Sequence, residues 1–207
     1  MAYTDVAAVR LLSNISSSTI SDNDINSFIS LATQQLNYDI SYAVEDEEVK
    51  YIDEVKQNDI DGVNKTYYVQ KQYIGDKTNS GSLTTSDVEV YSIDSDGTKT
   101  YLTISSIDST EGSVTLSTAP SSVRVFLNYR SCPLQVDDAM LSKACTELSN
   151  AYAHSRIEPH NIKRIGRMTL GNGSEFDFWY KQYQNTVRTI LARRTPSRID
   201  GNGIEFW

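Results

Sequence analysis

The sequence predicts an α+β protein: a small helical bundle, with three main helices and a short N-terminal helix, that carries an inserted antiparallel β-sandwich or barrel domain. Two observations predict this class. Apolar residues recur with a helical period towards both ends of the 207-residue chain. Short alternating runs of β-branched and aromatic residues fill the middle. We therefore assign residues 1–45 and 132–196 to a helical core, residues 46–131 to the β domain and residues 197–207 to a flexible tail.

The stretch from Ser21 to Ala43 is the longest predicted helix. Ser21 is a residue type that accepts hydrogen bonds at a helix start, where negative charge at Asp22 and Asp24 is also favourable. The apolar residues fall on one side of this helix, which must therefore pack on other helices. They are Ile25, Phe28, Ile29, Ala32, Leu36, Ile40 and Ala43.

Three other helices are predicted. A short one spans Val6 to about Leu12, and a second long one spans about residues 136–156. The last begins after Ser174 and ends before Pro196, which cannot continue a helix. We expect ten side chains of the long helices to form the helical core and to take part in packing between copies. They are Ile25, Phe28, Ile29, Ala32, Leu36, Met140, Ala144, Leu148, Trp179 and Tyr183.

Between these helices, six or seven short strands alternate with turn-forming clusters. The clearest are DVEVYSI at 87–93, SVTL at 113–116 and VRVFLNY at 123–129, with a further strand at 101–106. The first strand is expected to open at Val49, and the acidic run before it is interpreted as a solvated junction. Short strands at this spacing favour a small antiparallel sandwich or barrel.

The charge of the chain is uneven. Its formal net charge is −8, but residues 1–154 hold 10 Lys and Arg against 22 Asp and Glu, whereas residues 155–207 hold 9 against 5. An acidic body disfavours specific binding of nucleic acid, which needs a basic surface. We also expect no membrane partner, because no apolar run is long enough to span a bilayer. The opening MAYTDVAAVRLL lacks the pattern of a classical signal peptide.

No motif for catalysis, for metal binding or for a cofactor is complete in the sequence. His154 and His160 have no further ligand at a suitable spacing, so an interface or surface role is favoured. Cys132 and Cys145 are interpreted as small buried thiols. The run 94–97 is interpreted as a hairpin turn, not a calcium loop. We therefore expect no cofactor and no enzymatic activity.

The last residues, SRIDGNGIEFW, place large apolar side chains after a glycine-containing linker. Such side chains need a surface that covers them. Two interpretations stay open: the tail folds back on its own core, or it docks on a partner or on a neighbouring subunit.

Two blocks of the sequence resemble the tailed-phage head–tail connector family, the adaptor or head-completion proteins that lie beneath the portal. The first block is TDVAAVRLLSN followed by ISDNDINSFISLATQQLNYDI. The second contains CPLQVDDAMLSKACTELSNAYAHSRI and IKRIGRMTLGNGSEFDFWYKQYQNTVRTILARR. Between them, DIDGVNKTYYVQ and SIDSTEGSVTLSTAP are similar to β insertions of some virion connector proteins.

The resemblance implies a structural protein of the virion neck, between capsid and tail, that is assembled in the host cytoplasm. Such adaptors form a homo-oligomeric ring, usually of twelve copies, on the portal protein. They extend the channel through which genomic DNA passes without specific binding, and they offer a docking platform to the next neck or tail-completion protein. The alternative is another phage neck or tail protein whose β domain is a binding module.

The resemblance also implies that the C-terminal tail reaches the portal. In this sequence that role would fall on Arg193, Arg194, Arg198, Ile199, Ile204, Phe206 and Trp207.

Overall fold

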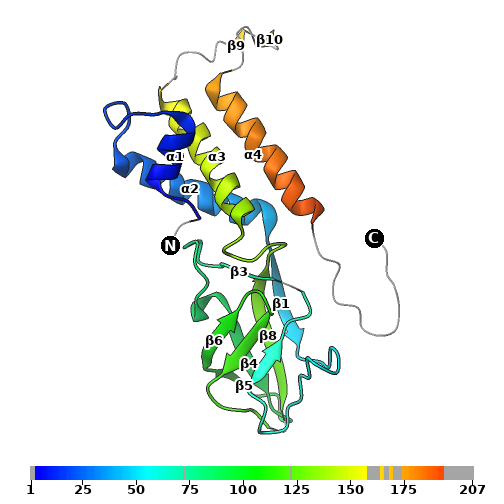
Figure 1. The fold of residues 1–207 in the computed structure, drawn as a ribbon. Helices are drawn as coiled ribbons and strands as arrows, with labels where there is room; N and C mark the ends of the chain where they lie inside the picture. Colours follow the sequence, from blue (N-terminus) through cyan, green and yellow to red (C-terminus); the bar gives the residue numbers. More distant parts are fainter. Residues whose placement is uncertain are drawn as a thin grey trace. The chain divides into compact units, whose positions relative to one another are not determined.

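The computed structural model describes residues 3–71, 73–121, 123–157, 164–165, 168–169 and 174–193. The chain divides into two compact units, which are described separately (Figure 1). The helical unit contains Met1–Ile40, Asn79–Ser82 and Asp137–Ala192, and the β unit contains Ser41–Thr78 and Leu83–Val136. The chain thus leaves the helical unit after residue 40, rejoins it briefly at Asn79–Ser82 and returns to it at residue 137. The sequence predicted that the helical core stops at residue 45 and resumes at residue 132.

Four helices form the helical unit: α1 (Val6–Ser13), α2 (Asp22–Ile40), α3 (Ala139–Ile157) and α4 (Glu175–Ala192). The predicted α+β class, with four helices and antiparallel strands, is confirmed. Helices α2 and α3 each pack against the other three, and α3 makes the more extensive contacts. In Figure 1, α1 and α4 lie on opposite sides of α3. Two-residue strands β9 (Arg164–Ile165) and β10 (Met168–Thr169) pair antiparallel between α3 and α4.

The helix starts follow from side-chain caps. Asp5, Ser21 and Ser174 each accept a hydrogen bond from the main-chain N–H three residues later, at 2.8, 3.2 and 3.1 Å respectively. Each bond satisfies one N–H group that the first turn of a helix leaves free. Helix α1 ends at Ser13, and the residue after it, Asn14, has a left-handed φ of 55° and donates its N–H to the carbonyl of Arg10 in the last turn. The predicted starts of α1, α2 and α4 are confirmed.

The predicted end of the first long helix is wrong. Helix α2 stops at Ile40, and strand β1 (Tyr42–Glu48) follows at once, with Ala43 exposed in the strand. The acidic run Glu45–Glu48 is therefore part of a strand and not a junction, and the strand ends before Val49. Helical periodicity missed this strand because β1 lies at the edge of a sheet, where charged residues are common.

The β unit holds two antiparallel sheets. In the five-stranded sheet the order is β1–β8–β4–β5, and β3 also pairs with β8; the three-stranded sheet has the order β2–β7–β6. The described strands close no barrel, so the barrel alternative is wrong for them. A short 3₁₀ helix, η1 (Thr85–Asp87), precedes β4. The strands are β2 (Thr66–Tyr68), β3 (Ile74–Gly75), β4 (Glu89–Ile93), β5 (Lys99–Leu102), β6 (Ile104–Asp108), β7 (Ser113–Leu116) and β8 (Arg124–Ser131).

Both sheets contribute to one buried apolar cluster. Val90 of β4 and Leu127 of β8 come from the larger sheet, whereas Tyr67 of β2 and Val114 of β7 come from the smaller one. Residues on the opposite side of each strand point away from this core. The predicted strands at 87–93, 113–116 and 123–129 are confirmed by β4, β7 and β8.

The predicted strand at 101–106 is wrong in one respect. The structure has two strands there, β5 and β6, which belong to different sheets and are separated by Thr103 alone. The predicted hairpin turn at 94–97 is confirmed: it joins β4 to β5, and the N–H of Gly97 donates to the carbonyl of Asp94 at 3.0 Å. Gly97 has φ +86°, a conformation that residues with a Cβ rarely adopt.

Candidate interaction surfaces

The ten residues predicted for the helical core lie in the helical unit, and most of them are enclosed there. Seven are buried: Ile25, Ile29, Ala32, Leu36, Ala144, Leu148 and Tyr183. The other three, Phe28, Met140 and Trp179, are half-buried. A side chain enclosed within its own chain has little surface left for a neighbouring copy. The seven therefore stabilise the helical unit, and the predicted part of the ten residues in packing between copies stays a prediction.

Of the seven residues predicted to bind the portal, the structure describes only Arg193, which follows α4 and is exposed. The other six, and His160 with them, lie outside the described residues: Arg194, Arg198, Ile199, Ile204, Phe206 and Trp207. His154 is buried in α3, so the surface alternative is wrong for it, and the interface alternative stays a prediction.

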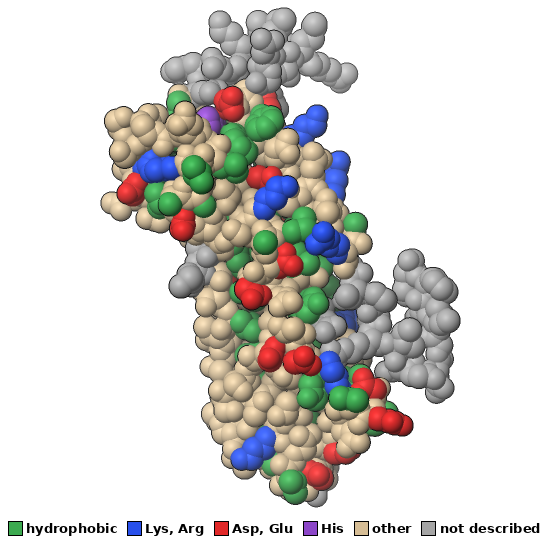
Figure 2. Space-filling model, viewed as in Figure 1, with side chains coloured by type: hydrophobic (Ala, Val, Ile, Leu, Met, Phe, Trp, Pro, Cys, Tyr) green, Lys and Arg blue, Asp and Glu red, His purple; other side chains and the backbone are tan. Residues whose placement is uncertain are grey.

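Large apolar side chains are exposed on the helical unit. Figure 2 shows hydrophobic side chains at the surface over α1 and over the first turns of α4. Exposed apolar area of this kind is covered only by contact with another surface. The exposed residues of α1, α2, α3 and α4 are Leu11, Leu12, Leu31, Tyr38, Ile157, Phe178 and Tyr180. On α1, Leu11 is 88% exposed, although Val9 two residues earlier is fully buried.

Aromatic rings concentrate in the first turns of α4. Phe176 stacks on Tyr180 with ring centroids 5.7 Å apart, and Phe178 meets Trp179 edge to face at 5.0 Å. The indole N–H of Trp179 is buried and finds no hydrogen-bond acceptor among the described residues. Aromatic side chains that combine a large apolar surface with a polar edge are frequent anchors of protein interfaces.

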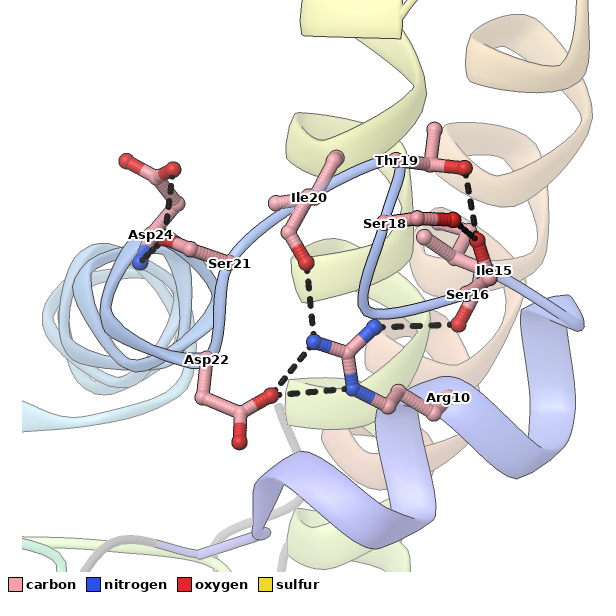
Figure 3. A network of polar contacts seen from close by, with 9 residues as sticks. All are labelled: Arg10, Ile15, Ser16, Ser18, Thr19, Ile20, Ser21, Asp22 and Asp24. Carbon is pink, nitrogen blue, oxygen red and sulfur yellow. Dashed lines mark hydrogen bonds and ion pairs between the residues drawn. The ribbon is translucent and has the colours of Figure 1, made fainter.

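The guanidinium of Arg10 fixes the loop between α1 and α2 (Figure 3). Its Nη1 donates to the carbonyl of Ile15 at 3.0 Å, and its Nη2 donates to the carbonyl of Ile20 at 2.8 Å. The same group forms an ion pair with Asp22 in the first turn of α2. The planar fork of donors in arginine suits three acceptors at once. Arg10 thus ties the end of α1, where Leu11 and Leu12 lie, to the loop that follows and to the start of α2.

Two polar contacts tie α4 to its neighbours. Thr186 donates to Glu147 Oε2 of α3 at 2.7 Å, and the Tyr183 hydroxyl donates to Asp39 of α2. Burial, reinforced by the bond to Asp39, raises the pKa of Tyr183 above its usual range. Burial also raises the pKa of Cys145 to about 11, so this thiol stays protonated and unreactive in the folded unit.

Neighbouring glutamates on β1 have opposite environments. Glu47 accepts from the N–H of Gln70 and from the Tyr129 hydroxyl, both at 2.8 Å, and burial raises its pKa. Glu48 accepts from Arg124 Nε at 2.6 Å on the other side of the strand, and this bond lowers its pKa. The acidic strand is therefore held to the sheet through its own carboxylates.

An aromatic row crosses the face of the five-stranded sheet that points away from the core. Phe126 of β8 is paired with Tyr91 of β4, and Tyr91 with Tyr101 of β5. Their ring centroids are 5.2 and 6.1 Å apart. Lys99 Nζ lies 3.6 Å from the centroid of Tyr91. Because Tyr91 and Phe126 are buried and Tyr101 is 65% exposed, Tyr101 is the ring of this row that a ligand can reach.

Across the part of the chain that the structure describes, no group of three or more His, Cys, Asp or Glu residues could hold a metal ion. No described helix combines the length and the apolar character that a membrane crossing requires.

The sequence did not predict the contacts of Arg10 or the contacts of the acidic strand β1, because the partner residues lie on other elements. Compared with known protein families and with curated proteins, the chain matches none.

Proposed function

We propose that this chain is a structural protein of a tailed-phage neck, a head–tail connector that forms a ring beneath the portal protein. In this role it extends the DNA channel, presents a docking platform to the next neck or tail protein and catalyses no reaction. The observation that best supports the proposal is the placement of exposed apolar side chains on α1 and on α4, which flank α3 (Figure 1).

This placement favours a ring because the two surfaces differ. The surface of α1 offers aliphatic side chains, Leu11 and Leu12, whereas that of α4 offers the aromatic Phe178 and Tyr180. A contact of α1 in one copy with α4 in the next is heterologous, so a pair of copies keeps one free α1 surface and one free α4 surface. Heterologous contacts continue from copy to copy and close into a ring when the rotation allows it.

The β unit suits the inside or the rim of a DNA channel because it is acidic. Residues 41–78 and 83–136 carry eight Lys and Arg against fifteen Asp and Glu, a net charge of −7. Few phosphate contacts mean that DNA passes without being held. We take its two sheets, which share one core, as a small β-sandwich. The basic end of the chain, from Arg193 onwards, is then the segment that reaches the portal.

The test is the mass of the assembly, measured by native mass spectrometry with the full-length protein alone and with its portal. We expect a ring of defined stoichiometry under at least one of these conditions. Leu11→Ser and Phe178→Ser should each reduce it to monomers, because each removes one half of the contact. The matched control is Val55→Ser, since Val55 is 86% exposed but lies in the β unit. A protein that stays monomeric and ignores the portal contradicts the proposal.

A second experiment separates portal binding from ring formation. Deletion of residues 197–207 should abolish the complex with the portal and leave the folded core intact, as judged by circular dichroism. If the shortened chain still binds the portal, the tail is not the anchor and the assignment of Ile204, Phe206 and Trp207 is wrong.

A further inference from the structure

We propose that the β unit binds a neutral sugar ring in a pocket at the corner between its two sheets. The pocket is shallow and open to solvent, has a volume of about 320 Å³ and is lined by residues of η1, β4, β5 and β6. Small-molecule sites commonly begin at this size. All the lining residues belong to the β unit of one chain. The proposal therefore holds or fails independently of whether the chain forms a ring.

The path of the chain creates this pocket. Strand β5 pairs with β4 only as far as Leu102, which lies opposite Val90. The chain then passes through Thr103 into the other sheet, where β6 begins at Ile104. Glu89, the first residue of β4, is consequently left without a strand neighbour on the β5 side. The residues of η1 line the space that results.

The lining combines an apolar floor with hydroxyl groups that are free to bind. Val88 and Ile104 supply apolar surface from the edge of the core. The side-chain hydroxyls of Thr85 and Thr103 have no hydrogen-bond partner among the described residues. Glu89 adds a carboxylate, which Lys77 Nζ holds at 3.1 Å. Sugar hydroxyls both donate and accept hydrogen bonds, so hydroxyls beside a fixed carboxylate match them.

Tyr101 supplies the stacking surface that a sugar ring needs. Its ring is 65% exposed and is supported on one side, where it meets Tyr91 edge to face at 6.1 Å and lies 5.0 Å from Lys99 Nζ. An aromatic ring supported in this way loses little conformational freedom on binding. The C–H face of a pyranose can stack on it while the sugar hydroxyls reach the pocket.

The charge of the unit selects a neutral ligand. Residues 41–78 and 83–136 carry a net charge of −7, and the field of the unit as a whole disfavours anions, with Lys77 and Lys99 the cations beside the pocket. A site that contacts one sugar ring has few contacts to offset the loss of free motion, so we expect a Kd of about 1 to 10 mM for a monosaccharide. Repeated units of a polysaccharide would raise the apparent affinity when several copies bind together.

The test uses the full-length protein and four neutral probes: the methyl glycosides of glucose, galactose, mannose and N-acetylglucosamine. Binding is followed by saturation-transfer NMR and by chemical-shift titration up to about 50 mM. At least one probe should bind, and glucuronic acid should not. Tyr101→Ala should weaken binding at least about tenfold, and Thr103→Val about threefold, which correspond to the loss of a stacking contact and of one hydrogen bond.

The matched control is Tyr51→Ala, because Tyr51 is 57% exposed in the same unit but does not line the pocket. This variant should bind like the wild type. Far-UV circular dichroism checks that every variant is folded. The proposal is overturned if none of the four glycosides binds, if binding survives Tyr101→Ala in a folded protein, or if glucuronic acid binds more tightly than the neutral probes.

Discussion

The helical unit and the β unit differ in the distance along the chain over which their contacts act. A helix in this protein is defined locally: the side chain of Ser21 caps the N–H of Asp24, and apolar residues recur every three or four positions. A strand is defined by distant residues: the Glu47 carboxylate on β1 accepts from the hydroxyl of Tyr129, 82 positions later. For this reason local sequence patterns predict the helices of the helical unit but not all the strands of the β unit.

Each unit also has its own core and its own cysteine, which allows the two to be followed separately. Cys145 is fully buried in α3 of the helical unit, and Cys132 is 4% exposed beside β8 in the β unit. A buried thiol reacts with a labelling reagent only after the surrounding structure opens. The labelling rates of the two thiols therefore report the opening of the two units.

The largest expected effect comes from truncating a core side chain of one unit. Leu148 of α3 is fully buried, so Leu148→Ala should lower the free energy of unfolding of the helical unit by about 3 kcal/mol. Labelling of Cys145 in urea should become faster while labelling of Cys132 is unchanged. The matched variant in the β unit is Leu127→Ala, which should accelerate the labelling of Cys132 and leave the labelling of Cys145 unchanged. If either variant accelerates both thiols equally, the two units unfold as one.

A medium effect is expected where one polar side chain holds a long loop. In the β unit, buried Asn58 donates to the carbonyls of Lys50 and Tyr68, at 2.7 and 2.9 Å, and accepts from the N–H of Tyr68 at 2.8 Å. Asn58→Ala leaves these main-chain groups unpaired and should cost about 2 kcal/mol. Arg10→Lys keeps the charge but loses the fork, so it should cost about 1 kcal/mol.

Urea unfolding monitored through the two thiols distinguishes these two variants. The effect of Asn58→Ala should appear at Cys132, and the effect of Arg10→Lys at Cys145. Gln35→Ala serves as a control because Gln35 is exposed and, within the described part of the chain, its amide bonds only the Asp39 side chain four positions later. A larger loss for Arg10→Lys than for Asn58→Ala would show that the helical unit depends more on its loop than the β unit does.

The same comparison accounts for what the sequence could predict. The four helices, three of their starts and strands β4, β7 and β8 follow from local periodicity and from capping residues. Strand β1 was missed because an acidic edge strand carries no apolar alternation. The division between β5 and β6 was missed because Thr103 has no feature that marks a change of sheet. Tyr101 was expected in a strand, but the sequence does not show to which face of the sheet its ring points. Its pairing with Tyr91 places the ring on the face away from the core, where it is exposed.

The smallest expected effect concerns the adjacent glutamates of β1, which should respond to pH in opposite directions. Burial raises the pKa of Glu47 above its model-compound value of 4.5, so the folded state favours its protonated form. Its contribution to stability is present below that value and is lost as the pH rises through the folded-state pKa. Arg124 lowers the pKa of Glu48, so the contribution of Glu48 is present above 4.5 and is lost as the pH falls.

Neutral amides at these two positions therefore change different parts of the pH profile. Glu47→Gln should reduce the loss of stability above about pH 4.5, and Glu48→Gln should reduce the loss below about pH 4.5, each by less than about 1 kcal/mol. Urea midpoints at about pH 3.5, 5.5 and 7 measure both. Salt should weaken only the effect at Glu48, because its partner Arg124 is exposed whereas Glu47 is partly enclosed. If both variants flatten the same part of the profile, the strand responds as a whole, and its two sides are not independent.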